Sequence, residues 1–163
     1  MATWVLTGSP ENYAATAARG HALIGMKERR RLMAEQMEPG DRIVLYLTRV
    51  MAFAAAIRLT GELFEDRTPV WPGKPGKVDP YPLPRPEASS PLRSRFSAEP
   101  ELVLEEDAWL PAETVKDELE WIRKWPAEHW KLAFQGQLRT VSEADARVLL
   151  DAMRARSAAS VGR

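Results

Sequence analysis

The sequence predicts a single α+β domain. Short runs of strand-forming residues alternate along the chain with segments of helical character, and 163 residues are enough for one domain with a buried core. The clearest run is the apolar stretch at 42–49, which directly follows a Pro-Gly-Asp turn signature at 39–41. We therefore expect one domain over residues 1–155, followed by a flexible C-terminal tail at 156–163.

The other elements follow from hydrophobic periodicity and from turn residues. In chain order we expect a strand at 3–7, a helix at 11–18, a strand near 22–25, a helix at 27–37, the strand at 42–49, a strand at 51–64, a proline-rich passage at 69–91, a strand at 101–104, a helix at 112–124, a short strand near 130–134 and a helix at 142–154. Ser9 is the expected N-cap of the first helix, with Pro10 at its first position. The alanine-rich stretch after Met51 has helical propensity, but its alternation favours the return strand of a hairpin.

Composition excludes several kinds of site. The chain has no cysteine, which excludes disulfides and thiolate metal ligands and fits a reducing, cytoplasmic compartment. No apolar run approaches the roughly 20 residues that span a bilayer, so we expect no membrane partner. Phosphate-loop, dinucleotide-binding, metalloprotease and nucleophile-elbow motifs are absent from the sequence. His21 and His129 lack nearby metal-ligand companions, so we expect no catalytic residue, no metal and no cofactor.

Charge is balanced overall but segregated along the chain. The net charge is zero, which argues against a chain that only binds phosphates. The segment 19–31 is basic, whereas the segment 99–120 carries nine acids and one lysine. Solvent-exposed surface is the favoured interpretation of the acidic segment. For the basic segment, exposed surface and phosphate binding weigh equally.

Six tryptophans are many for a chain of this length. Trp4 begins a buried strand, and Trp121 and Trp125 share one face of the predicted helix at 112–124, so we expect all three in the core. Trp71 differs, because it stands in the proline-rich passage, where no core periodicity explains it. A tryptophan held stiffly by neighbouring prolines makes a good stacking wall for a planar base.

Several sequence blocks in a fixed order carry a resemblance to a known family. They are WVLT at 4–7, LIGM at 23–26, GDRIVLYLT at 40–48, DRTPVW at 66–71 and WKLAFQGQLR at 130–139. In the order and spacing of these blocks, the chain from Trp4 to Met153 resembles EVE domains, which are members of the PUA-like superfamily and relatives of YTH domains. The resemblance implies a small, curved β-barrel with surrounding helices, and a pocket for one methylated or hydroxymethylated base.

The resemblance also implies which residues form this pocket. One wall comes from the turn after the first helix, where the family often has Gly-Val-Trp-Gly and this chain has Ala-Leu-Ile-Gly at 22–25, so an isoleucine replaces the tryptophan. The second wall falls near Trp71. The predicted ligand-binding residues are Ser9, Asn12, Ile24, Gly25, Met26, Tyr46, Thr48 and Trp71. Phosphate contacts are predicted for Lys27, Arg29 and Arg30, at the start of a helix whose amide groups favour anions.

The predicted function is therefore recognition of a modified base in DNA or RNA without catalysis. The polar residues of this set also fit plain roles as helix caps and surface groups. The alternative function is a regulatory module that binds a protein or a small nucleotide through the proline-rich passage at 69–91, because extended proline-rich segments are often docking surfaces. A nuclease would need carboxylates clustered at a metal, and the acids at 99–120 are expected at the surface instead.

Overall fold

The computed structural model of the chain describes residues 2–18, 20–21, 23–26, 36–60, 64–66, 93–134 and 138–161. The predicted helix at 27–37 lies almost wholly outside these residues, and the proline-rich passage at 69–91 lies wholly outside them. The same holds for Trp71 and for the three predicted phosphate contacts, Lys27, Arg29 and Arg30.

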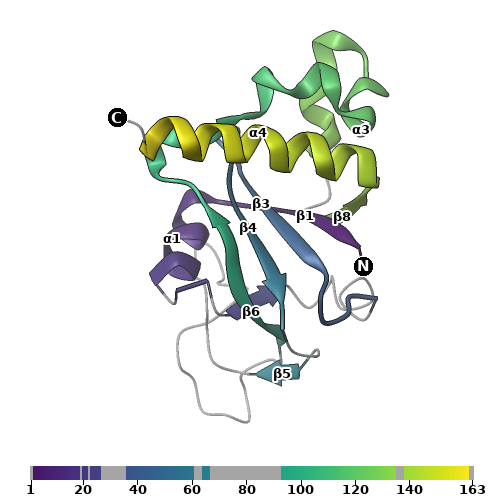
Figure 1. The fold of residues 1–163 in the computed structure, drawn as a ribbon. Helices are drawn as coiled ribbons and strands as arrows, with labels where there is room; N and C mark the ends of the chain where they lie inside the picture. The colour runs from purple at the N-terminus through teal and green to yellow at the C-terminus, as the bar shows by residue number, and fades with distance from the viewer. Residues whose placement is uncertain are drawn as a thin grey trace, which may run out of the picture.

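A sheet forms the centre of the molecule (Figure 1). Its strands are β1 (Thr3–Gly8), β2 (Leu23–Met26), β3 (Arg42–Leu47), β4 (Ala52–Leu59), β5 (Phe64–Asp66), β6 (Arg93–Val103), β7 (Leu110–Pro111) and β8 (Leu138–Val141). They follow the order β2-β6-β4-β3-β1-β8, while β5 pairs with β6 and β7 with β4. The pair of β1 and β3 is parallel, and the other strand pairs described are antiparallel. Within the described residues β2 does not pair with β8, so a closed barrel is not confirmed, whereas the mixed α+β class is.

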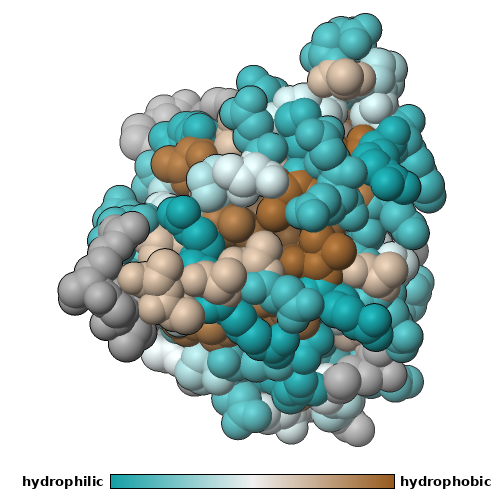
Figure 2. Space-filling view, turned by 45° about the horizontal axis from the view of Figure 1, so that its top comes forward, coloured by the Kyte–Doolittle hydropathy of each residue, from teal (hydrophilic) through white to brown (hydrophobic). Residues whose placement is uncertain are grey.

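Helices surround this sheet. They are the α-helices α1 (Pro10–Ala18), α3 (Glu120–Arg123) and α4 (Glu143–Val161), and the 3-10 helices η3 (Glu106–Ala108), η4 (Ala112–Thr114), η5 (Lys116–Glu118) and η6 (Ala127–Phe134). Figure 1 shows α4 crossing the sheet, with the short helices around α3 beyond it and α1 following the end of β1. On the face turned forward in Figure 2, apolar side chains gather in the middle and hydrophilic ones surround them.

The sheet buries apolar side chains on both faces. One cluster joins strands to α4 and includes Val5, Val44, Phe53, Leu149 and Met153. The other cluster includes Trp4, Leu6, Ile43, Leu45 and Ile57. Burial on both faces explains why β1 and β3 have continuous apolar sequences instead of alternating ones. The prediction of strands at 3–7 and 42–49 is confirmed.

The predicted strand near 130–134 is wrong, because these residues form the end of the 3-10 helix η6. A strand would place Trp130, Leu132 and Phe134 on one face. Instead Ala133 is fully buried while Leu132 is 36% exposed, and the Phe134 ring stacks on Tyr46 at 3.9 Å. The strand that pairs with β1 comes later, as β8.

The predicted helix at 112–124 is broken into η4, η5 and the short helix α3. Helix α3 ends before Trp125, which precedes Pro126, and the residue before a proline disfavours helical backbone. Trp121 is therefore buried, at 6% exposure, but Trp125 is 36% exposed. Core placement is confirmed for Trp4 and Trp121 and is wrong for Trp125.

Other boundaries shift. The predicted strand at 51–64 ends at Leu59 as β4, and the one at 101–104 is the end of the longer strand β6. Helix α4 continues to Val161, so most of the segment expected as a flexible tail is helical. A long helix is stabilised here by packing of its buried face against the sheet.

Two buried carboxylates connect elements that are distant in sequence. Asp41 accepts hydrogen bonds from the N–H groups of Ala2 (3.0 Å) and Glu38 (3.0 Å) and from Nε1 of Trp4 (3.1 Å). Asp145 of α4 accepts hydrogen bonds from the first two N–H groups of α3, at 2.8 and 3.2 Å. Since the local N-cap of α3 has no side-chain hydrogen bond, α4 supplies the cap from a distance.

Candidate functional site

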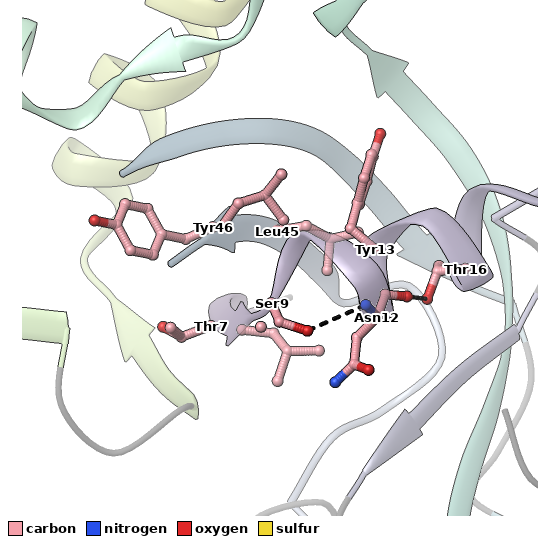
Figure 3. Close-up of a pocket in the computed structure, with 10 residues that line it drawn as sticks. Thr7, Ser9, Asn12, Tyr13, Thr16, Leu45 and Tyr46 are labelled. Atoms are coloured by element: carbon pink, nitrogen blue, oxygen red, sulfur yellow. Dashed lines mark hydrogen bonds between the residues drawn. The ribbon is translucent and has the colours of Figure 1, made fainter. Parts of the chain in front are cut away.

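A pocket lies where β1 passes into α1, against the end of β3 (Figure 3). It is lined by Leu6, Thr7, Gly8, Ser9, Asn12, Tyr13, Thr16, Leu45, Tyr46 and Leu47. The space free for water-sized molecules is about 20 Å³, and about 320 Å³ if the open mouth is counted. The inner part has room for roughly one water molecule. A base would therefore occupy the mouth or widen the pocket.

Local hydrogen bonds fix the turn at the pocket. The Asn12 N–H donates to Ser9 Oγ at 3.1 Å, and the hydroxyl of Thr16 donates to the Asn12 carbonyl at 3.2 Å. Ser9 is thus the N-cap of α1 and Pro10 its first residue, as the sequence predicts. The cap orients the first turn of the helix and so places Asn12 at the pocket wall.

The side-chain amide of Asn12 is a polar group of the lining that remains available to a ligand. Its side chain extends beside Ser9 in Figure 3 and makes no hydrogen bond to any described residue. A side-chain amide offers two donors and one acceptor. Asn12 can therefore hydrogen-bond the edge of a planar ligand that lies in the mouth.

Tyr46 and Thr48, predicted as further polar contacts, have other partners. The Tyr46 ring points away from Ser9 and Asn12 and stacks on Phe134 in the α4-side core, where burial raises the pKa of Tyr46 to about 12. The direction of the Tyr46 ring follows from the alternation of side chains along β3, because Leu45 and Tyr46 point to opposite faces of the sheet. The Thr48 N–H and Oγ1 both donate to the Gly8 carbonyl, at 2.9 and 3.4 Å.

Sequence reasoning missed Tyr13, which forms an aromatic side of the pocket. Its hydroxyl lies 3.3 Å from Nε2 of the buried His21, and its ring meets Trp109 edge-on at 5.8 Å. Burial, with a smaller effect of Glu105, raises the pKa of Tyr13 to about 12, and burial lowers the pKa of His21. The helical spacing of Asn12, Tyr13 and Thr16 places them on one face of α1, and this spacing in the sequence could have indicated that Tyr13 lines the pocket together with Asn12.

The predicted turn residues Ile24, Gly25 and Met26 form part of β2, which pairs with β6. The positions of their side chains lie outside what the structure describes. The wall expected from Trp71 lies outside the described residues, as do Lys27, Arg29 and Arg30.

A larger and more polar hollow lies at the opposite end of β1. It has a volume of about 410 Å³ and is lined by Ala2, Thr3, Arg42, Val141, Glu143, Ala146, Arg147, Leu150 and Arg154. Among the described residues, its lining contains no aromatic ring that could stack on a planar ligand. Glu101 also holds Arg42 through two hydrogen bonds, at 2.6 and 2.7 Å. Of the two, the pocket at α1 has the lining that fits a planar ligand better.

The acidic segment lies mostly at the surface, as expected. All nine of its acids are exposed, namely Glu99, Glu101, Glu105, Glu106, Asp107, Glu113, Asp117, Glu118 and Glu120. Among the described residues, no group of three histidines, aspartates or glutamates could hold a metal ion. No helix in the described part of the chain is long and apolar enough to cross a membrane.

Comparison with known proteins identifies the fold. No family model matches the chain, and no curated protein matches its sequence. The YTH domain of Zygosaccharomyces rouxii MRB1, in complex with N6-methyladenosine RNA, superposes with a TM-score of 0.60 over 94% of this chain and 86% of that one, at 10% identity. The chain has a YTH-related fold.

Two further structures share this YTH-related fold. Human THYN1, in complex with DNA that contains 5-methylcytosine, gives a TM-score of 0.56 at 12% identity, over 94% of this chain and 98% of that one. A variant of the ZmASCH protein from Zymomonas mobilis gives 0.56 at 12% identity, over 93% and 98%. Such likeness concerns the fold, and it agrees with the fold that the resemblance in the sequence blocks implies.

Proposed function

We propose that this YTH-related domain binds a modified base of DNA or RNA and performs no catalysis. The observation that carries the proposal is the Asn12 amide, which lines a largely apolar pocket and has no partner among the described residues. The amide would read the edge of the base. Leu6, Leu45 and Tyr13 would contact its face and its added methyl group.

Two structural neighbours support this class of ligand. MRB1 is in complex with N6-methyladenosine RNA and THYN1 with 5-methylcytosine DNA, and both ligands carry one methyl group more than the ordinary nucleic acid. Burial of one such group contributes about 0.8 kcal/mol, a roughly fourfold preference before any polar contact is counted. We expect modest affinity and strong dependence on salt, because phosphates supply much of the binding energy.

Titration of short labelled oligonucleotides tests the proposal. DNA and RNA strands with one 5-methylcytosine, one 5-hydroxymethylcytosine, one N6-methyladenine or no modification are followed by fluorescence anisotropy. We expect one modified strand to bind best, and Asn12→Ala and Trp71→Ala to remove that preference. Thr140→Ala, an exposed position on β8, is the control and should bind as the wild type does. Equal binding of all strands by the wild type would refute the proposal.

The alternative, binding of a protein or small nucleotide through the passage at 69–91, concerns residues outside the described part of the chain. No contact among the described residues favours it. The same titration separates the two functions, because a protein-binding module would show no preference between modified and unmodified strands.

A further inference from the structure

The turn between β3 and β4, at 48–51, lies at the rim of the base pocket. Leu47 lines the pocket, and Thr48 donates two hydrogen bonds to the carbonyl of Gly8, another lining residue. Arg49 then forms an ion pair with Glu11, which lies in the first turn of α1, next to Asn12. The turn is thus connected to both elements that build the pocket.

The backbone of this turn is strained. The Val50 N–H donates to the Thr48 carbonyl at 2.7 Å across Arg49, whose φ is +66°. This is a γ-turn with a positive central φ, the rare and strained form. Met51 also has a positive φ, of +53°. Glycine or asparagine would adopt such conformations at lower cost than arginine or methionine.

The turn presents a cation and an apolar group to solvent. The side chains of Arg49 and Glu11 are 63% and 58% exposed, and Val50 is 49% exposed. An ion pair at such exposure contributes little to stability, so another anion can replace the carboxylate at low cost. A phosphate accepts charge-assisted, bidentate hydrogen bonds from a guanidinium group as a carboxylate does.

We propose that the turn at 48–51 is the nucleic-acid contact beside the base pocket. Arg49 exchanges Glu11 for the backbone phosphate next to the bound base, and Val50 packs against the neighbouring base. The proposal rests on the proposed function and assigns the rim of the same site. Phosphate contacts set the register of a nucleic acid while base contacts supply specificity, so the turn positions the strand and the pocket reads it. Apolar side chains that insert between base steps unstack the bases in several protein–DNA complexes.

The salt dependence of binding tests the phosphate contact. The probes are short single-stranded DNAs with one 5-methylcytosine, one N6-methyladenine or neither, titrated between about 50 and 200 mM salt. Loss of one phosphate contact lowers the slope of log affinity against log salt by roughly 0.7 for a single strand. We expect this change for Arg49→Ala, and tighter binding for Glu11→Gln, with the preference for the modified base unchanged in both. Val50→Ser should weaken binding without changing the slope.

Arg49→Gly distinguishes lost binding from lost folding. Glycine relieves the positive φ, so this variant should have a higher Tm than the wild type while it binds nucleic acid less tightly. Arg154→Ala is the matched control, because Arg154 is also an exposed arginine in an ion pair but lines the hollow at the other end of β1. Its slope should equal that of the wild type.

Each outcome has a separate meaning. An unchanged slope in Arg49→Ala and Arg49→Gly, with preference for a modified base intact, overturns the turn contact and leaves the proposed function standing. A lower slope in Arg154→Ala alone also overturns the turn contact, because the nucleic-acid strand then follows the hollow at the other end of β1. Absence of any preference, with a slope that still depends on Arg49, refutes the base pocket and supports the turn. Absence of all binding overturns both.

Discussion

Replacement of the buried Asp41 by alanine should destabilise the fold by about 3 kcal/mol. The carboxylate accepts three hydrogen bonds, from the N–H groups of Ala2 and Glu38 and from Trp4 Nε1. The indole N–H is buried with its ring, at 3% exposure, and a buried donor without a partner costs about 1–3 kcal/mol. Glu38 is exposed and Ala2 is half-buried, so water can replace part of the hydrogen bonding that their two backbone N–H groups lose.

Urea denaturation followed by tryptophan fluorescence measures this loss. With an m-value of about 2 kcal/mol/M, the midpoint should fall by about 1.5 M while m stays unchanged. Asp151→Ala is the control, because its side chain is 67% exposed and its loss should cost less than about 0.5 kcal/mol. In a double-mutant cycle, Trp4→Phe should recover part of the cost of Asp41→Ala, because it removes the donor left unpaired. A loss below about 1 kcal/mol, or strict additivity in the cycle, would refute the assigned role of Asp41.

Two further predictions concern a distant cap and a buried histidine. Asp145→Ala should lower the free energy of unfolding by about 1–2 kcal/mol in the same denaturation assay, because the first N–H groups of α3 lose their acceptor. Amide hydrogen exchange should accelerate first in α3, and unchanged exchange there would contradict the assigned role of Asp145. Burial lowers the pKa of His21, so the unfolded state takes up the proton first, and the free energy of unfolding should fall as pH drops below about 6.5. His21→Asn, which tolerates the positive φ at this position, should flatten the curve between about pH 7 and 5, and an unchanged curve would argue against His21 as its source.

The sequence was sufficient for the elements whose signal is local. β1 and β3 are apolar on both faces, and α1 begins at Pro10, after Ser9 makes the hydrogen bond expected of an N-cap. Their positions were predicted to within one or two residues. The segment at 127–134 was not. Its last residue, Phe134, stacks on Tyr46 from a strand far away in sequence, and such a contact is not visible in the local pattern.

The candidate site was predicted in part for the same reason. The end of β1 and the first turn of α1 were indicated by the family blocks, and the structure places Ser9 and Asn12 together at one pocket. The direction of the Tyr46 ring depends on the register of β3, and the role of Tyr13 depends on its contact with Trp109. Neither tertiary contact is visible in a sequence window, although the helical spacing of Tyr13 with Asn12 and Thr16 is.

The pairing of the first strand with the last has a consequence for biosynthesis. β1 pairs with β8 through the register Trp4 with Thr140, and with β3 in parallel. A chain that emerges from the ribosome cannot complete its sheet until residue 141 has left the exit tunnel. During that time one edge of β1 is without its partner, and open strand edges promote aggregation. Contacts at such long sequence separation also slow folding, so we expect this small domain to depend on chaperones more than a helical bundle of equal length.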